Sequence, residues 1–284
     1  MSKRFTRIYF PHSGFRHDFS TLYELRSTHC PLMIAKTEKE IEILREGGRR
    51  LARHVRMLSD LVKQGITGAE LETKARAMVE KDGDILAFYG YGKEPYPSGL
   101  CFSVNDVIVH CPASDSMTPV EDGDIVCLDF GIKHKGLFTD HAVTVIAGKP
   151  KNDDDVRLVR GAFAALELGI KAARLGNTTG DIGYAVERYA KEHGFGYPKN
   201  LSGHGVGKKV HEEPHVPNFG APKSGEKLVE GLVIAIEPMF TLGSGELYVD
   251  KDGHSYRTKD GSRTAHAEHT VIVTENGPEI LTKE

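Results

Sequence analysis

Apolar side chains recur at three- and four-residue steps from residue 37 onwards, which predicts an amphipathic helix. The segment "TEKE" that opens this pattern is a capping box, in which Thr37 caps the first turn and Glu40 reaches back to the Thr37 amide. The apolar stripe is interrupted at Gly48 and consists of Ile41, Leu44, Leu51, Val55, Leu58 and Val62. A second helical pattern follows "QGITG" and ends at "KDGD".

The same order of patterns recurs in the second half of the chain. The helical segments "NDDDVRLVRGAFAALELGIKAARLG" and "NTTGDIGYAVERYAKEHGF" repeat the first two, and "EDGDIVCLDFG" and "TDHAVTVIAGKP" resemble "VEGLVIAIEPM" and "AEHTVIVTENGP". Chance similarity between two generic β-hairpins is the alternative explanation. The matched acids favour duplication, so we expect two pseudo-symmetric αβ halves, residues 37–150 and 151–284, that face each other across a cleft.

Each predicted strand pair carries one acid on each strand. Asp129 is expected to end an apolar strand, and Asp140 lies on the next strand, after a turn near residues 134–136. Side chains alternate along a strand, so the two carboxylates project from one face and must share a proton or bind a cation. Glu237 and Glu268 repeat this arrangement, and four converging carboxylates favour two divalent cations.

An imidazole for such a site is available in "LSGHGVGKKVHEEPHVP". His204 lies between Gly203 and Gly205, which allow the backbone to pack closely against a metal or ligand. One imidazole among carboxylate oxygens suits Mn, Fe(II), Co or Zn better than calcium, without choosing among them. A surface histidine in a simple turn is the alternative.

Composition narrows the classes of partner and compartment. The 284 residues carry a formal net charge of −3, which gives no long-range attraction to nucleic acid or to an anionic membrane. No apolar run approaches the ~18 residues needed to span a bilayer. Four cysteines without CxxC spacing favour a reducing cytoplasm. Residues 1–36 are basic, aromatic and aperiodic, and we expect a disordered or surface-draped extension rather than a transit peptide.

The motifs together resemble type I methionine aminopeptidases over residues 37–284. The resemblance rests on "CFSVNDVIVH", "DIVCLDFG" followed by "FTDHA", "GHGVGKKVHEEP", "AIEPMF" and "AEHTVIV" in that order. It implies the pita-bread fold, an α/β (α+β) architecture in which two αβ halves surround a curved, mainly antiparallel sheet. It also implies five metal ligands, which correspond to Asp129, Asp140, His204, Glu237 and Glu268.

The resemblance further implies a mechanism for removing an N-terminal methionine. A water held between two divalent cations attacks as hydroxide, with Asp129 and Glu268 bridging the cations. Glu237 is the expected proton shuttle to the leaving amine. His211 would hydrogen-bond the scissile carbonyl and its oxyanion, and His110 the scissile amide or leaving nitrogen.

The expected methionine pocket departs from the family pattern. Tyr96 and Cys101 match pocket positions, but Val210 stands where bacterial relatives usually carry Phe, and His254 where many carry Trp. After His110 the chain reads "CP" in place of the usual "GIP". Family drift with methionine still preferred is the favoured interpretation, together with a looser pocket.

Two other functions remain open on the sequence. One is a proline-specific aminopeptidase or prolidase of the same fold, although those enzymes usually carry an additional N-terminal domain. The other is a metal-free binding protein, which would have lost ligands that are all present here. The expected substrates are nascent polypeptides and peptides with a free N-terminal Met and a small second residue. We expect a monomer with no specific nucleic-acid partner and no membrane partner. The family's co-translational task makes the ribosome a candidate partner for residues 1–36.

Overall fold

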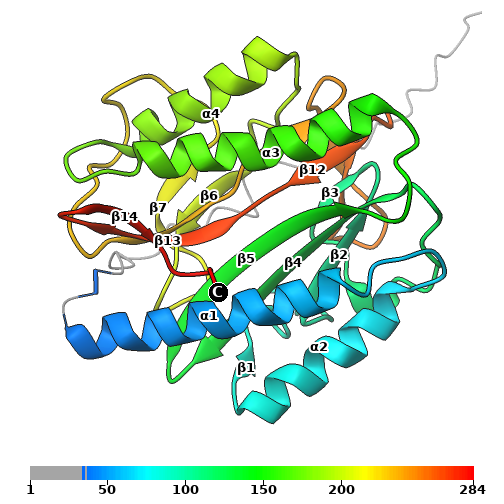
Figure 1. The fold of residues 1–284 in the computed structure, drawn as a ribbon, viewed down its shortest axis with the longest axis horizontal. Helices are drawn as coiled ribbons and strands as arrows, with labels where there is room; N and C mark the ends of the chain where they lie inside the picture. The colour runs from blue at the N-terminus through cyan, green and yellow to red at the C-terminus, as the bar shows by residue number, and fades with distance from the viewer. Residues whose placement is uncertain (1–33, 36) are drawn as a thin grey trace, which may run out of the picture. The chain divides into compact units, whose positions relative to one another are not determined.

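A computed structural model describes residues 34–35 and 37–284, and Figure 1 shows its ribbon. Except for residues 34 and 35, the predicted extension lies outside the described residues. The helices of the described part are α1 (Glu38–Ser59), α2 (Gly68–Asp82), α3 (Asp153–Ala172) and α4 (Thr179–His193), with a 3₁₀ turn at Ala113–Asp115. None of these helices is both long enough and apolar enough to cross a bilayer.

The α1 helix begins as the sequence predicts. The Thr37 hydroxyl oxygen accepts the Glu40 amide at 3.2 Å, and the Glu40 carboxylate accepts the Thr37 amide at 3.2 Å. Gly48 does not interrupt the helix. A Cβ at this position would lie 2.2 Å from the carbonyl oxygen of Leu281, so the glycine allows the C-terminal segment to pack directly on α1.

The strands form antiparallel sheets in both halves of the chain, and all strand pairs among the described residues are antiparallel. The strands are β1 (Ile85–Leu86), β2 (Leu100–Val104), β3 (Val107–Val109), β4 (Ile125–His134), β5 (Leu137–Ile146), β6 (Ser202–Gly205), β7 (Glu212–Pro217), β8 (Val233–Ile236), β9 (Met239–Thr241), β10 (Leu247–Val249), β11 (Tyr256–Thr258), β12 (Thr264–His266), β13 (His269–Thr274) and β14 (Gly277–Ile280). Two sheets are larger than the others. In the first, β4 pairs with β1, β2 and β5, and in the second the strands follow the order β14-β13-β8-β6-β7. The element order α1-α2-β4-β5 in the first half matches α3-α4-β8-β13 in the second, while duplication itself stays a prediction.

The sequence placed Asp129 at the end of an apolar strand, and this is wrong. The β4 strand continues to His134, because the alternation persists beyond Asp129 and Phe130 packs into the core under the helices. The hairpin turn lies where it was expected. Lys135 and Gly136 have φ values of 45° and 95°, as the two central residues of a tight hairpin turn require.

The two halves of the sheet meet where β5 runs beside β12 and β13 (Figure 1). The Glu268 amide donates to the Ala142 carbonyl oxygen at 3.0 Å. The Asp140 amide donates to the Thr270 hydroxyl at 2.8 Å, and this hydroxyl donates back to the Asp140 carbonyl oxygen at 2.8 Å. These bonds hold an acid from each half of the chain side by side.

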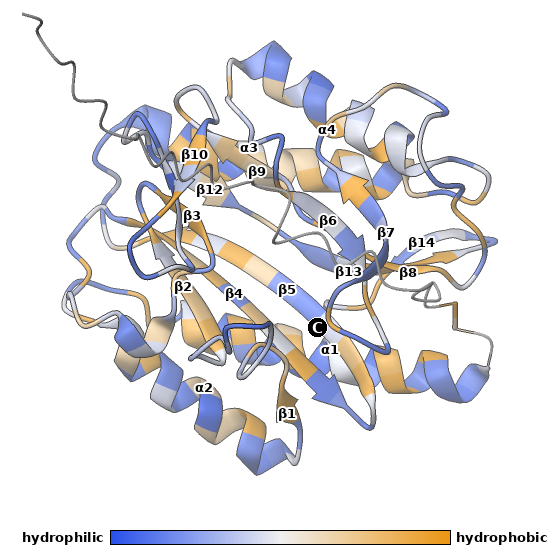
Figure 2. Ribbon diagram, turned by 180° about the vertical axis from the view of Figure 1, so that it is seen from behind, coloured by the Kyte–Doolittle hydropathy of each residue, from blue (hydrophilic) through white to orange (hydrophobic). Residues whose placement is uncertain are grey.

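The helices cover one face of the strands, and Figure 2 shows the molecule from the opposite side. Leu128 of β4 belongs to the core packed with α1 and α2, and Ile234 and Ile236 of β8 to the core packed with α3 and α4. Because side chains alternate, Asp129 and Glu237 project to the face away from the helices. The apolar pattern of each strand therefore fixes the side on which the acids gather.

Candidate metal centre

Five of the predicted site residues converge from five strands or strand ends. Asp129 lies on β4, Asp140 on β5 and His204 on β6, whereas Glu237 follows β8 and Glu268 precedes β13. Asp140 pairs with Gly131, so Asp129 lies diagonally across the hairpin on the same face. Ile236 of β8 pairs with His269 of β13. Glu237 and Glu268 are the next residues beyond this pair, so they lie opposite each other at the ends of these strands.

The donor atoms fall into two groups that share one carboxylate. Asp129, Asp140 and Glu268 form one group, and His204, Glu237 and Glu268 form the other, with the donor atoms of each group within 4.8 Å of one another. His204 Nε2 lies 3.6 Å from Glu237 Oε1 and 3.9 Å from Asp140 Oδ2. Glu268 thus faces both groups, whereas Asp129, the other expected bridging ligand, belongs to one of them.

Burial makes this cluster electrostatically costly without a cation. Glu268 and Asp140 are each 2 % exposed. Burial raises the pKa of Asp140 to about 7, and burial together with the neighbouring acids raises the pKa values of Asp129, Glu237 and Glu268 well above their ordinary range. Divalent cations would offset both the cost of burying the charges and the repulsion between them, because they neutralise the carboxylates.

The donor set fits divalent cations. Asp129 Oδ1 and Glu268 Oε1 are buried and have no hydrogen-bond partner among the described residues. Such an orphaned oxygen costs ~1–3 kcal/mol, which a metal ligand bond would offset. His204 Nδ1 lies 2.9 Å from the Gly205 carbonyl oxygen, so its proton resides there and the Nε2 lone pair faces the acids.

Metal-free protein is expected to lose stability as the pH rises above about 6.5. Unfolded carboxyls ionise near pH 4, whereas in the folded protein burial raises the pKa of Asp140 to about 7 and raises the pKa values of the other three acids well above their ordinary range. The folded state therefore binds more protons, and the free energy of unfolding falls as the pH rises. The buried histidines have the opposite effect on the free energy of unfolding, because the pKa of His204 is lowered from 6.5 to about 4. This effect changes little above about pH 6.5, where the histidines of the unfolded chain are also neutral.

Calorimetric melting of chelated protein between pH values of about 6.5 and 8.5 measures this dependence. The metal-loaded protein should show a smaller slope, because bound cations keep the carboxylates ionised in the folded state. Asp140→Asn removes one of the four acids and should flatten the metal-free slope. A melting temperature of the chelated wild type that stays constant or rises over this range would contradict the expectation.

His110 and His211 lie at the edge of the cluster and are exposed to solvent. His211 forms a third group with Asp140 and His204, and its ring packs edge-on to that of His204 at 4.4 Å between centroids. Although both residues are accessible, surrounding protein atoms lower the pKa of His110 to about 4 and that of His211 well below 6.5, to which the neighbouring His204 contributes. Both rings are neutral hydrogen-bonding groups near pH 7.

The backbone of His110 could not be anticipated from its sequence context. Its φ of 62° lies in the left-handed region, directly after the end of β3. Such a conformation is strained for a residue with a side chain, and it turns the chain sharply at the end of the strand. The His110 ring meets the Tyr256 ring edge-on at 5.5 Å between centroids.

Three of the four expected pocket residues pack together beside the acids. Tyr96, Cys101 and Val210 belong to one buried apolar cluster with Ala87 and Phe88. The Tyr96 hydroxyl donates to the Cys101 sulfur at 3.2 Å, and Cys101 pairs with Asp129 in the register between β2 and β4. The fourth residue, His254, packs edge-on against the Tyr96 ring at 5.4 Å between centroids.

Sequence reasoning missed one residue of the site. His266 is 1 % exposed, and its Nε2 lies 3.5 Å from Glu237 Oε2 and 3.9 Å from Glu268 Oε2. Its position two residues before Glu268 was the available signal, because alternating strand residues share a face. Burial lowers the pKa of His266 to about 3, with contributions from neighbouring histidines.

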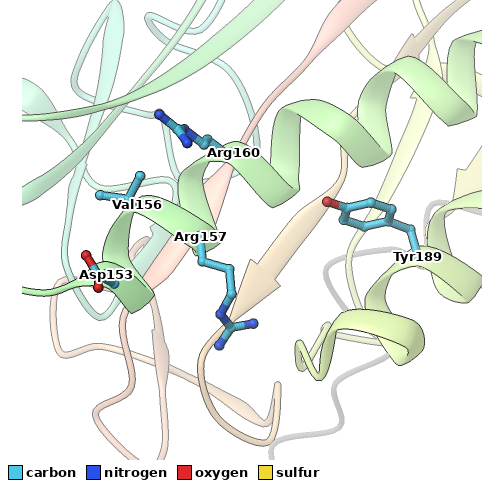
Figure 3. A pocket seen from close by; sticks show the side chains of 5 residues that line it. All are labelled: Asp153, Val156, Arg157, Arg160 and Tyr189. Atoms are coloured by element: carbon cyan, nitrogen blue, oxygen red, sulfur yellow. The ribbon is translucent and has the colours of Figure 1, made fainter.

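A separate surface pocket lies between α3 and α4 and shares no residue with the cluster. Figure 3 shows that its labelled side chains come from these two helices. The residues that line it are Asp153, Val156, Arg157, Arg160 and Tyr189.

Known proteins are similar to this chain in both sequence and fold. The model of metallopeptidase family M24 matches residues 42–275. Methionine aminopeptidase of Aquifex aeolicus is 41% identical over 255 residues, which cover 87% of this chain and 97% of that protein. The crystal structure of methionine aminopeptidase from Thermotoga maritima superposes with a TM-score of 0.85 at 38% identity, covering 89% of this chain and 100% of that chain.

The likeness extends more distantly to proline-specific enzymes. The prolidase from Pyrococcus horikoshii superposes with a TM-score of 0.69 at 25% identity, covering 88% of this chain and 64% of that chain. The two structural matches confirm the predicted pita-bread fold.

Proposed function

The chain belongs to metallopeptidase family M24, and from this premise we propose that it removes the N-terminal methionine from peptides and nascent proteins. The observation that carries the proposal is the meeting of five buried donors, in two groups that share Glu268, beside the apolar cluster of Tyr96, Cys101 and Val210. This cluster is adjacent to the donors because its Cys101 pairs directly with Asp129. An apolar first side chain bound there would place its peptide bond near the acids.

Divalent cations held here would supply a Lewis acid and a water acidic enough to react near neutral pH. Asp140, His204 and Glu268 would hold them together with Asp129 and Glu237. We assign two ions, of Co, Mn, Fe(II) or Zn, because the donors form two groups around a shared carboxylate. One imidazole nitrogen among carboxylate oxygens leaves the choice of metal open.

The remaining chemistry belongs to side chains around the donors. Glu237 accepts the proton of the attacking water through a carboxylate oxygen and delivers it to the leaving amine. His211 donates a hydrogen bond to the scissile carbonyl oxygen, whose negative charge grows during attack. His110 holds the scissile nitrogen. Because both rings are neutral near pH 7, each carries one N–H that can donate such a hydrogen bond.

Hydrolysis of a peptide series tests the specificity. Met-Ala-Ser should be the best substrate, with norleucine within about tenfold in kcat/KM and Ala at least about 100-fold lower, because each missing methylene in an apolar pocket costs ~1–3 kcal/mol. Leu should be cleaved weakly, since Val210 is smaller than the Phe of bacterial relatives and leaves the pocket looser. Efficient cleavage of Ala or Leu peptides but not Met peptides would contradict the proposal.

A proline-specific activity is the second candidate because prolidases share the fold. Peptides with proline in the second position, assayed beside Met-Ala-Ser and Met-Lys-Ser, separate the two functions. The extent of coverage favours methionine removal, since this chain spans nearly all of its methionine aminopeptidase relatives but 64% of the prolidase. Binding to ribosomes through residues 1–36, a monomeric state and a cytoplasmic location stay predictions.

A further inference from the structure

His266 is a buried imidazole that the proposed mechanism does not use. It ends β12, where its neighbours Ala265 and Ala267 belong to the core packed with α3 and α4. Alternation therefore directs the His266 ring to the face that carries the acids. Thr144 of β5 fixes its backbone: the Thr144 hydroxyl accepts the His266 amide at 3.0 Å and donates to the His266 carbonyl oxygen at 2.6 Å.

Two imidazoles flank the Glu237 carboxylate, and each faces a different oxygen. His204 Nε2 lies 3.6 Å from Oε1, and His266 Nε2 lies 3.5 Å from Oε2. His266 Nε2 is also 3.9 Å from Glu268 Oε2. The orientation of the Glu237 carboxylate therefore depends on whether each Nε2 carries a proton or a lone pair.

The two rings differ in the nitrogen that carries the proton. The Nδ1 of His204 has a carbonyl acceptor at 2.9 Å, so its Nε2 is free to bind a cation. Neither ring nitrogen of His266 has a hydrogen-bond partner within the described part of the chain. Carboxylate oxygens lie 3.5 and 3.9 Å from Nε2, and from this we infer that the neutral ring carries its proton on Nε2. A protonated Nε2 donates a hydrogen bond and does not coordinate a metal.

We propose that His266 is a positioning residue for Glu237, whose Oε2 accepts the His266 Nε2–H while Oε1 stays turned towards His204. This role rests on the metal centre proposed above. A donor that fixes a ligating carboxylate selects one of its orientations in advance, and removing such a partner typically weakens metal binding ~10–100-fold. Donation to Oε2 also satisfies a buried polar group that is otherwise unpaired.

Calorimetric titration with Co(II) and the visible absorption of the Co(II) protein test the role independently of activity. His266→Leu removes the donor and should weaken binding of the tighter Co(II) ion about 10–100-fold. His266→Gln keeps an N–H at similar reach and should bind within about threefold of the wild type, with an unchanged absorption spectrum. His193→Gln, at the end of α4, is the matched control and should bind like the wild type.

Each contrary outcome has a distinct meaning. Wild-type affinity in His266→Leu would overturn the positioning role while leaving the metal centre intact. A changed Co(II) spectrum in both His266 variants would identify His266 as a metal ligand and overturn the role as a donor. Wild-type protein that takes up no Co(II) would overturn the metal centre, and the His266 role with it. Thermal melting of each variant in chelator verifies that the compared proteins are folded.

Discussion

Removal of divalent metal with a chelator is expected to abolish hydrolysis of Met-Ala-Ser, lowering kcat by more than about a thousand-fold. Without cations, burial and mutual repulsion favour the protonated form of the acids, as the raised pKa values of Glu237 and Glu268 indicate. Protonated carboxyls can neither accept a proton from water nor orient it for attack. The loss should be reversed by adding back Mn, Fe(II), Co or Zn to the chelated protein, and the metal that restores most activity identifies the best candidate.

Adding metal back to the chelated protein also measures how much the metal stabilises the fold. A ligand at 100 times its Kd that binds only the folded state adds ~2.7 kcal/mol to the free energy of unfolding, so the melting temperature should rise as metal is added. Elemental analysis of the reloaded protein gives the stoichiometry, for which we expect two ions per chain. Full activity in chelated protein with no measurable metal would refute the metal-dependent mechanism.

The helices and hairpins of the fold could be read from local patterns. The capping box at Thr37 and the apolar stripe that follows it depend on residues close in sequence, so α1 begins where the pattern begins. The extent of β4 was misjudged because an acid in an apolar run resembles a strand end, whereas here the strand continues to His134. The contact between β5 and β13 joins segments more than a hundred residues apart, and no local pattern fixes such a register.

The donor set was more accessible to sequence reasoning than the residues that orient it. Asp129, Asp140, Glu237 and Glu268 occupy equivalent places in two similar segments, and the structure gathers all four with His204. His266 carries no repeat partner, and its role depends on ring geometry that only the folded chain defines. Similarly, the left-handed backbone of His110 follows from how β3 ends, which its residue type does not reveal.

Replacing Glu237 by glutamine is expected to lower kcat about 10²–10⁴-fold, the usual contribution of a positioned acid–base group. Glutamine keeps the size of the side chain and one oxygen that can face His204, but it cannot accept a proton from water. The pocket and the donors His110 and His211 are untouched, so KM for Met-Ala-Ser should change little. Stopped assays of kcat and KM on metal-reloaded variant, with bound metal counted, separate loss of proton transfer from loss of metal.

The partly buried Glu187 on α4 provides the matched control, because Glu187→Gln makes the same chemical change where it contacts Tyr197. It should leave kcat unaltered. If Glu237→Gln binds two ions and retains kcat within about tenfold of the wild type, proton transfer passes through another group. Loss of one ion from Glu237→Gln would instead make metal binding its dominant role. An intact ion count with a large loss in kcat would support the shuttle, because metal binding would be retained while the side chain can no longer accept and release a proton.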